Sequence, residues 1–221
     1  MVELNRRTFL SGSVAAGAAA LFGTEAAHAA GAVKLPAKWD ETADVVIVGS
    51  GFAGLAAAIE AKKAGASVVV LEKMATVGGN SIINGGILTA TGCPQQKKHG
   101  IKDSPELLAH DMLVAGLYLN NPEKVKLVAD NALSNYEWTV NELGVEYNPD
   151  AIGQEGGHSV ARYVTTKNGS GSGIVSKEID KCKELGIPLL NRVFVERIIR
   201  DRKSTRLNSS HTDSSRMPSS A

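Results

Sequence analysis

The stretch that decides the fold runs from Asp44 to Ser81 and reads DVVIVGSGFAGLAAAIEAKKAGASVVVLEKMATVGGNS. It opens with a β-branched run that predicts a short buried strand over 44–48. A glycine-rich turn follows, and then an alanine-rich helix over 55–64 that should end at Gly65. A second β-branched run over 67–71 predicts another strand. A strand, a turn, a helix and a strand within this length predict one βαβ unit.

The glycine turn has the GxGxxG spacing of a dinucleotide-binding loop. Gly49 permits the tight turn out of the strand, Gly51 lets a pyrophosphate approach the backbone, and Gly54 lets the helix lie close to the sheet. The free N–H groups at the helix N-terminus favour phosphates. Glu72 follows the second strand, where its carboxylate can accept hydrogen bonds from a ribose diol and would repel the ribose phosphate of NADP. We therefore expect dinucleotide binding; the alternative is a glycine turn that binds no ligand.

The residues after Glu72 narrow the choice of dinucleotide. Lys73 is followed by VGGNS at 77–81 and NGG at 84–86. Together with GSGFAGLAAAIEA and LEK, these motifs resemble the flavoprotein family of fumarate reductases and succinate dehydrogenases, and within it the exported, soluble flavocytochrome c-type branch. The resemblance covers residues 40–201 and implies FAD as cofactor. The FAD-binding residues expected on this basis are Gly49, Gly51, Phe52, Ala53, Gly54, Glu72, Lys73, Gly79, Asn80, Ser81, Gly85, Gly86 and Val195.

The same resemblance implies a mode of binding and a reaction. Succinate dehydrogenases of this family hold FAD covalently through a histidine near the position of Asn80 and Ser81. This sequence has no histidine between His28 and His99, so the FAD should be non-covalent, which favours the reductive direction. The implied reaction is hydride transfer from the flavin to an unsaturated carboxylate, with fumarate as the default substrate and urocanate, methacrylate and related compounds as alternatives. A separate haem- or quinol-linked partner should supply electrons, because no CxxCH motif is present.

Residues 1–29 are interpreted as an export signal. NRRTFL at 5–10 resembles a twin-arginine motif. The apolar stretch 10–22 is too short to span a bilayer, which takes about 20 residues, and AHA at 27–29 is typical of a cleavage site. Because the twin-arginine route exports folded proteins, FAD would be loaded before export and the mature protein would be periplasmic.

The rest of the chain predicts further elements: helices over 104–116, 121–143 and 168–185, a surface loop over 95–102, and strands over 187–191 and 192–200. The first two helices begin with SPE and NPE, each an N-cap followed by a proline and an acid. In the loop 153–162, His158 and Arg162 are candidates for direct contact with substrate or flavin. The competing interpretation gives this loop a structural role beside the cofactor.

The predicted fold is α/β: a Rossmann-like FAD-binding domain with a mostly parallel sheet, partial over 30–201 and incomplete at the C-terminus. From 202 to 221 the serine-rich sequence lacks periodicity and resembles translated adapter sequence, which predicts a disordered, non-native tail. The residues that bind substrate and donate the proton should then lie beyond Asp201. No catalytic residue is assigned within the chain, and this fragment should be inactive.

The composition is that of a globular protein, with 43% hydrophobic residues and a net charge of +1. Such a balance argues against a nucleic-acid partner, and no metal-site spacing occurs. Two alternative functions stay open. One is a ketosteroid dehydrogenase-like flavoenzyme, which shares the glycine motifs, and the other is a truncated flavin-binding fragment without catalysis.

Overall fold

The computed structural model describes residues 38–200 and 207–212, so the predicted export signal lies outside the described residues. The chain divides into two compact units. The larger unit comprises residues 41–198 and 209–221 and holds the cavities and side-chain clusters discussed below. The smaller unit comprises residues 1–40 and 199–208, most of which are not described.

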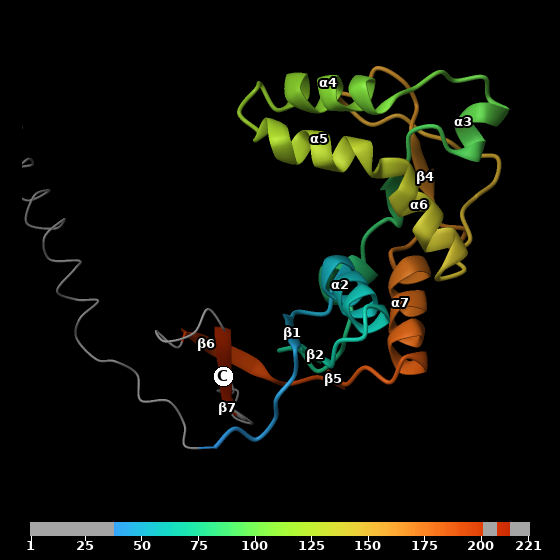
Figure 1. The fold of residues 1–221 in the computed structure, drawn as a ribbon. Helices are drawn as coiled ribbons and strands as arrows, with labels where there is room; N and C mark the ends of the chain where they lie inside the picture. Colours follow the sequence, from blue (N-terminus) through green and yellow to red (C-terminus); the bar gives the residue numbers. More distant parts are fainter. Residues whose placement is uncertain (1–37, 201–206, 213–221) are drawn as a thin grey trace, which may run out of the picture. The chain divides into compact units, whose positions relative to one another are not determined.

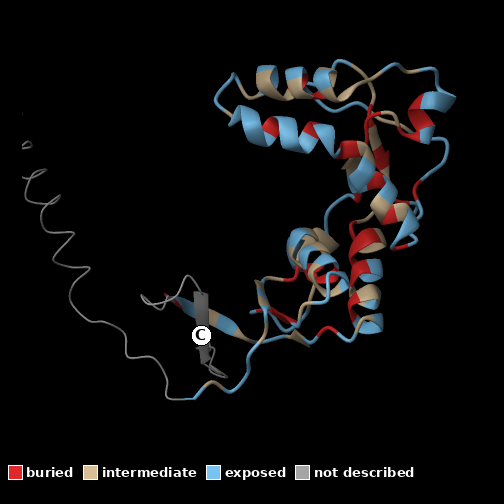
Figure 2. Ribbon diagram, in the orientation of Figure 1, coloured by how far each residue is buried: buried red, intermediate tan, exposed pale blue. Residues whose placement is uncertain are grey.

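The predicted βαβ unit is confirmed. Strand β1 (Val45–Val48), helix α2 (Phe52–Lys63) and strand β2 (Val68–Leu71) follow one another, and β1 pairs with β2 in parallel, with Val45 opposite Val68. Strand β5 (Leu189–Leu190) pairs in parallel with the other edge of β2, giving the order β1-β2-β5. All four residues of β2 are buried because it is the central strand of the three (Figure 2).

Two helices form the core with this sheet. Helix α2 buries Leu55, Ala58 and Ile59 completely, and it packs against both strands of the parallel pair. Helix α7 (Ser172–Glu184) lies beside α2 and contributes Ile174, Val175 and Cys182 to the same core (Figure 1). The predicted helix over 168–185 is thus confirmed, with its first turn at Ser172.

The segment between the sheet strands is largely helical. It comprises the 3-10 helix η1 (Gly79–Ile82), strand β3 (Ile87–Thr89), helices α3 (Pro94–Lys98), α4 (Pro105–Ala115), α5 (Pro122–Asp130) and α6 (Ala132–Asn141), and strand β4 (Tyr163–Thr165). Strands β3 and β4 form an antiparallel pair, and α4 packs beside α5 (Figure 1). Both predicted N-caps are confirmed, because Ser104 Oγ accepts from Leu107 N–H and Asn121 Oδ1 accepts from Lys124 N–H.

Two sequence predictions in this segment are wrong. The single helix expected over 121–143 is two helices, because the Asn131 side chain donates to the Leu127 carbonyl and ends α5 there. The expected surface loop over 95–102 begins with α3. Its Gln96 is fully buried, and the Gln96 amide donates to Asp103 Oδ2 and to the Ala161 carbonyl, both at 2.8 Å. Ala161 is 65 residues from Gln96 along the chain, so this contact leaves no local signal in the sequence.

The last two strands lie before and after residue 201, where the sequence predicts that the FAD-binding domain ends and a non-native tail begins. Strand β6 (Phe194–Arg200) confirms the expected strand over 192–200, and β6 forms a two-stranded sheet with β7 (Leu207–Thr212). Strand β7 stands in the stretch for which the sequence predicts disorder. The domain boundaries themselves stay predictions. Within residues 38–200 and 207–212, no helix is both long enough and apolar enough to cross a membrane.

Candidate functional site

The glycine turn between β1 and α2 has the geometry that the motif predicts. Gly49 adopts a left-handed φ of 96°, which favours glycine, and its N–H donates to the Leu71 carbonyl at 2.8 Å. Gly51 precedes the first residue of α2. A Cβ added at Gly54 would overlap the carbonyl oxygen of Gly49. The helix therefore begins directly above the carboxyl ends of two parallel strands, where α/β proteins bind their ligands.

Glu72 lies at the same edge and is almost fully buried. Its Oε2 accepts hydrogen bonds from Ser50 N–H at 3.0 Å and from the Ser50 hydroxyl at 2.6 Å, and its Oε1 accepts from Met74 N–H at 2.8 Å. Burial alone would raise the pKa of this carboxyl, but the hydrogen bonds from Ser50 and Met74 outweigh burial and lower it. Glu72 is therefore ionised at neutral pH, and its three hydrogen bonds hold the carboxylate in one orientation.

A cavity of about 730 Å³ opens beside this carboxylate. Its wall combines the glycine turn, the end of β2, the start of β6 and the VGGNS segment at 77–81, which we call the second glycine loop. Seven of the predicted FAD-binding residues line it: Gly49, Gly51, Glu72, Lys73, Gly79, Asn80 and Val195. Backbone hydrogen bonds hold the wall, because Val193 N–H donates to the Glu72 carbonyl at 2.9 Å and Arg192 N–H donates to the Met74 carbonyl at 3.0 Å. We call this cavity, with its lining, the cradle.

The other predicted residues lie outside the lining of the cradle. Phe52, Ala53 and Gly54 form the first turn of α2, and Ser81 Oγ accepts from Phe52 N–H at 3.1 Å. Gly86, at a left-handed φ of 66°, packs so closely that an added Cβ would overlap Thr166 Oγ1. Gly85 also lies outside the lining. The cofactor contacts of all thirteen residues stay predictions.

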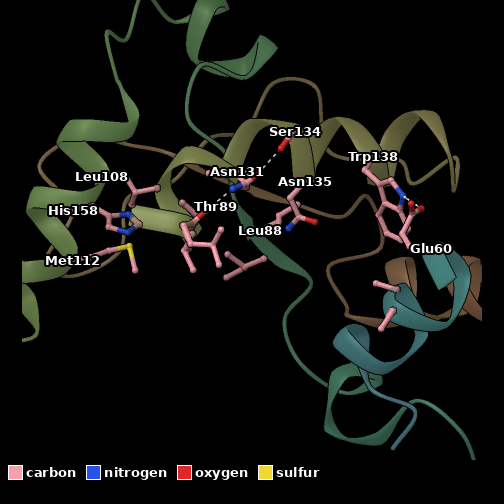
Figure 3. Close-up of a pocket in the computed structure, with 16 residues that line it drawn as sticks. Glu60, Leu88, Thr89, Leu108, Met112, Asn131, Ser134, Asn135, Trp138 and His158 are labelled. Atoms are coloured by element: carbon pink, nitrogen blue, oxygen red, sulfur yellow. Dashed lines mark hydrogen bonds between the residues drawn. The ribbon is translucent and has the colours of Figure 1, made fainter. Parts of the chain in front are cut away.

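A second cavity, of about 1080 Å³, is lined mainly by apolar side chains (Figure 3). Its lining comes from α2, β3, α4, α5 and α6, with His158 beside Leu108 and Met112. Trp138 Nε1 donates to Glu60 Oε1 at 2.8 Å on its wall. Burial, and then the nearby Arg162 charge, lower the pKa of His158. His158, one of the two candidates for substrate or flavin contact, lines this cavity and is not part of the cradle lining.

Arg162, the other candidate for direct contact, is a buried structural residue. Its guanidinium donates to both oxygens of Asp103, at 3.0 Å each, and to Asp111 Oδ2 at 2.5 Å. The Arg162 and Asp103 side chains are fully buried, and Asp111 is 6% exposed. Asp111 also accepts from the N–H and hydroxyl of Ser159. This ion cluster fixes the loop 153–162 to α4 and leaves the guanidinium inaccessible to a ligand.

The ion cluster predicts a dependence of stability on pH. Burial would raise the pKa of Asp111, but hydrogen bonds from Ser159 and Arg162 lower it from 3.8 to about 2. A carboxyl with a depressed folded-state pKa stabilises the fold above its unfolded pKa and loses that contribution as the pH falls through the folded value. The expected contribution is roughly 2 kcal/mol above pH 4. Urea unfolding between pH 6 and pH 2.5 should lose less stability in Asp111→Asn than in the wild type; equal losses would contradict the assignment.

Together the fold and the cradle define a dinucleotide-binding domain. The helix N-terminus suits phosphate, the fixed Glu72 carboxylate suits a ribose hydroxyl, and the second glycine loop extends the cradle beyond the first. The chain's own residues therefore suit a long dinucleotide such as FAD.

Comparison with known proteins specifies the class. The FAD binding domain family matches residues 44–212, and the twin-arginine translocation signal family matches residues 3–23. The chain belongs to the FAD binding domain family, and its cofactor is FAD. The signal directs export, which places the protein in the periplasm.

Similar proteins include two reductases and a steroid dehydrogenase. The chain is 41% identical over 201 residues to the acrylate reductase flavoprotein subunit of Shewanella woodyi, covering 90% of the chain and 39% of that protein. The open conformation of a flavocytochrome c3 fumarate reductase superposes with a TM-score of 0.69 at 32% identity, covering 73% of the chain and 28% of that structure. The 3-ketosteroid-Δ4-(5α)-dehydrogenase of Rhodococcus jostii RHA1 superposes with a TM-score of 0.71 at 25% identity, covering 81% of the chain and 44% of that structure. The chain thus spans less than half the length of each.

Sequence reasoning missed Ser50, which occupies a variable position of GxGxxG. No spacing rule assigns a role to that position, so only the fold reveals its contact with Glu72. The Asp103–Arg162–Asp111 cluster was missed for a similar reason, since Arg162 is 59 residues from Asp103 and 51 residues from Asp111 along the chain.

Proposed function

We propose that this chain is the FAD-binding part of an exported reductase that acts on α,β-unsaturated carboxylates such as fumarate, acrylate or urocanate. The observation that carries the proposal is the cradle, in which a helix N-terminus, two glycine loops and the ionised Glu72 converge on one cavity. Family membership and the resemblance to acrylate and fumarate reductases support it. Bound FAD, once reduced by two electrons, would supply the hydride that is transferred to the unsaturated carboxylate.

In this proposal the chain's residues bind and orient the cofactor. The N-terminus of α2 and the glycine turn take the pyrophosphate, Glu72 accepts from the adenosine ribose, and Val195 lies beside the adenine. Attachment is non-covalent, because Asn80 and Ser81 occupy the region where covalent members carry a histidine. The electrons come from a separate haem- or quinol-linked partner.

The binding part of the proposal can be tested on the chain itself. Purified protein should carry flavin absorbance through gel filtration and release all of it on acid precipitation, since no covalent bond is expected. AMP should compete with FAD for the cradle, whereas 2′,5′-ADP, which adds only a 2′-phosphate to AMP, should compete poorly because that phosphate would approach the Glu72 carboxylate. Protein that neither co-purifies with FAD nor binds it on titration would contradict the proposal, and acid-resistant flavin would contradict the non-covalent attachment.

A ketosteroid dehydrogenase-like activity is the second candidate, because that solved structure matches at a TM-score of 0.71. Anaerobic reoxidation of the photoreduced flavoprotein separates the two. We expect this chain, which spans 39% of the acrylate reductase flavoprotein subunit and 44% of the steroid dehydrogenase, to reoxidise no faster than free reduced FAD with fumarate, acrylate, urocanate or a steroid enone. Acceleration by the carboxylates alone would place reductase activity in this chain, and acceleration by the steroid alone would overturn the carboxylate assignment.

A further inference from the structure

Ser50 links three segments of the cradle through one hydroxyl group. The residue is fully buried between the glycine turn and the end of β2. Its Oγ donates to Glu72 Oε2 at 2.6 Å and accepts from Gly78 N–H at 2.9 Å. Gly78 is buried, and it lies in the second glycine loop at a left-handed φ of 113°. The Ser50 side chain therefore joins the glycine turn, Glu72 and the second glycine loop.

The hydrogen bonds also limit what Glu72 can offer to a ligand. A carboxylate has about four acceptor positions, two on each oxygen. Ser50 N–H and the Ser50 hydroxyl fill both positions on Oε2, and Met74 N–H fills one position on Oε1. One acceptor position on Oε1 is left. The carboxylate is thus fixed in orientation and can accept one further hydrogen bond.

We propose that Ser50 is a positioning residue that orients Glu72 to accept from a single ribose hydroxyl of an adenine dinucleotide and fixes the second glycine loop in place before the ligand arrives. The proposal rests on the FAD binding proposed above. An oriented carboxylate and a formed loop reduce the ordering that binding would otherwise require, so the hydroxyl contributes to affinity without touching the ligand.

The chain contains a matched control for this arrangement. Ser67 N–H and hydroxyl both donate to Asp44 Oδ2, at 2.9 and 2.6 Å, and Ser67 Oγ accepts from Asp44 N–H at 2.9 Å. The chemistry is the same as at Ser50, but this pair lies at the amino ends of β1 and β2, away from the cradle, and it is exposed to solvent.

The test compares Ser50→Ala with Ser67→Ala in the full chain. FAD affinity, measured by quenching of flavin fluorescence, should fall about tenfold to a hundredfold in Ser50→Ala, because hydrogen bonds to charged groups have effects of that size. Ser67→Ala should bind FAD like the wild type. In Ser50→Ala the loss of affinity on acidification should also begin at higher pH, since Glu72 has lost a donor that favours its ionised form. Unchanged affinity and an unchanged pH profile in Ser50→Ala would overturn the proposal.

A second measurement does not depend on FAD. Amide hydrogen exchange of the apo protein should show that Gly78 N–H loses protection in Ser50→Ala and keeps it in Ser67→Ala. If Gly78 N–H loses protection in Ser50→Ala while the wild-type chain does not bind FAD, the proposed function is rejected and the link through Ser50 is supported. Retained protection, or a Ser50→Ala chain that fails to fold while Ser67→Ala folds, would reject the positioning role.

Discussion

Replacing Arg162 by alanine is expected to lower the free energy of unfolding by about 3–5 kcal/mol, the cost of breaking a buried ion pair by removing one partner. The variant would leave the carboxylates of Asp103 and Asp111 buried without their cation. The two carboxylates would repel each other. They would have to be protonated, or water would have to enter the cluster to solvate them. The loop 153–162 should detach from α4 as a result. Urea unfolding at neutral pH, followed by circular dichroism, measures the change.

The control is an ion pair on the surface. Lys167 and Glu146 approach to 2.9 Å but are 72% and 69% exposed. Solvent screens such a pair, so Lys167→Ala should leave the unfolding midpoint unchanged. If Arg162→Ala is as mild as Lys167→Ala, the buried cluster does not hold the loop.

The second large effect is expected at Gly54. In Gly54→Ala the new methyl group would overlap the backbone carbonyl of Gly49 and would press on Ile47 Cγ2 at 3.3 Å. Backbone cannot rotate away as a side chain can, so α2 must shift from the sheet. We expect a loss of about 3 kcal/mol in the free energy of unfolding and loss of FAD binding, because a shift of α2 would displace its N-cap Gly51, which lines the cradle.

Gly156→Ala is the matched control, since no atom lies within 4 Å of the added Cβ and the backbone has no left-handed φ there. That variant should be as stable as the wild type or slightly more so. Thermal unfolding and FAD titration of the two variants, side by side, provide the measurement. Wild-type FAD affinity in Gly54→Ala would contradict the role assigned to this contact.

The sequence predicted the βαβ unit and much of the cradle because their signals are local. Glycine spacing, β-branched runs and the acid after β2 each follow from short-range rules, and Gly49, Gly54 and Glu72 lie as those rules require. The ion cluster, the buried Gln96 and the division of the helix at Asn131 depend on partners or on side-chain contacts that no spacing encodes. His158 and Arg162 were predicted to contact substrate or flavin from their residue types alone. In the fold, neither residue lines the cradle.

The two serine–carboxylate pairs also bear on how the sheet assembles. Ser67–Asp44 joins the chain just before β1 and β2, and Ser50–Glu72 joins it just after them. Only four residues of each strand pair in between. A slip of one residue would turn every side chain to the opposite face and would also break both pairs. Strand register is therefore fixed at both ends of a very short ladder, and the acid assigned to the ribose also holds the two strands in register in the folded protein.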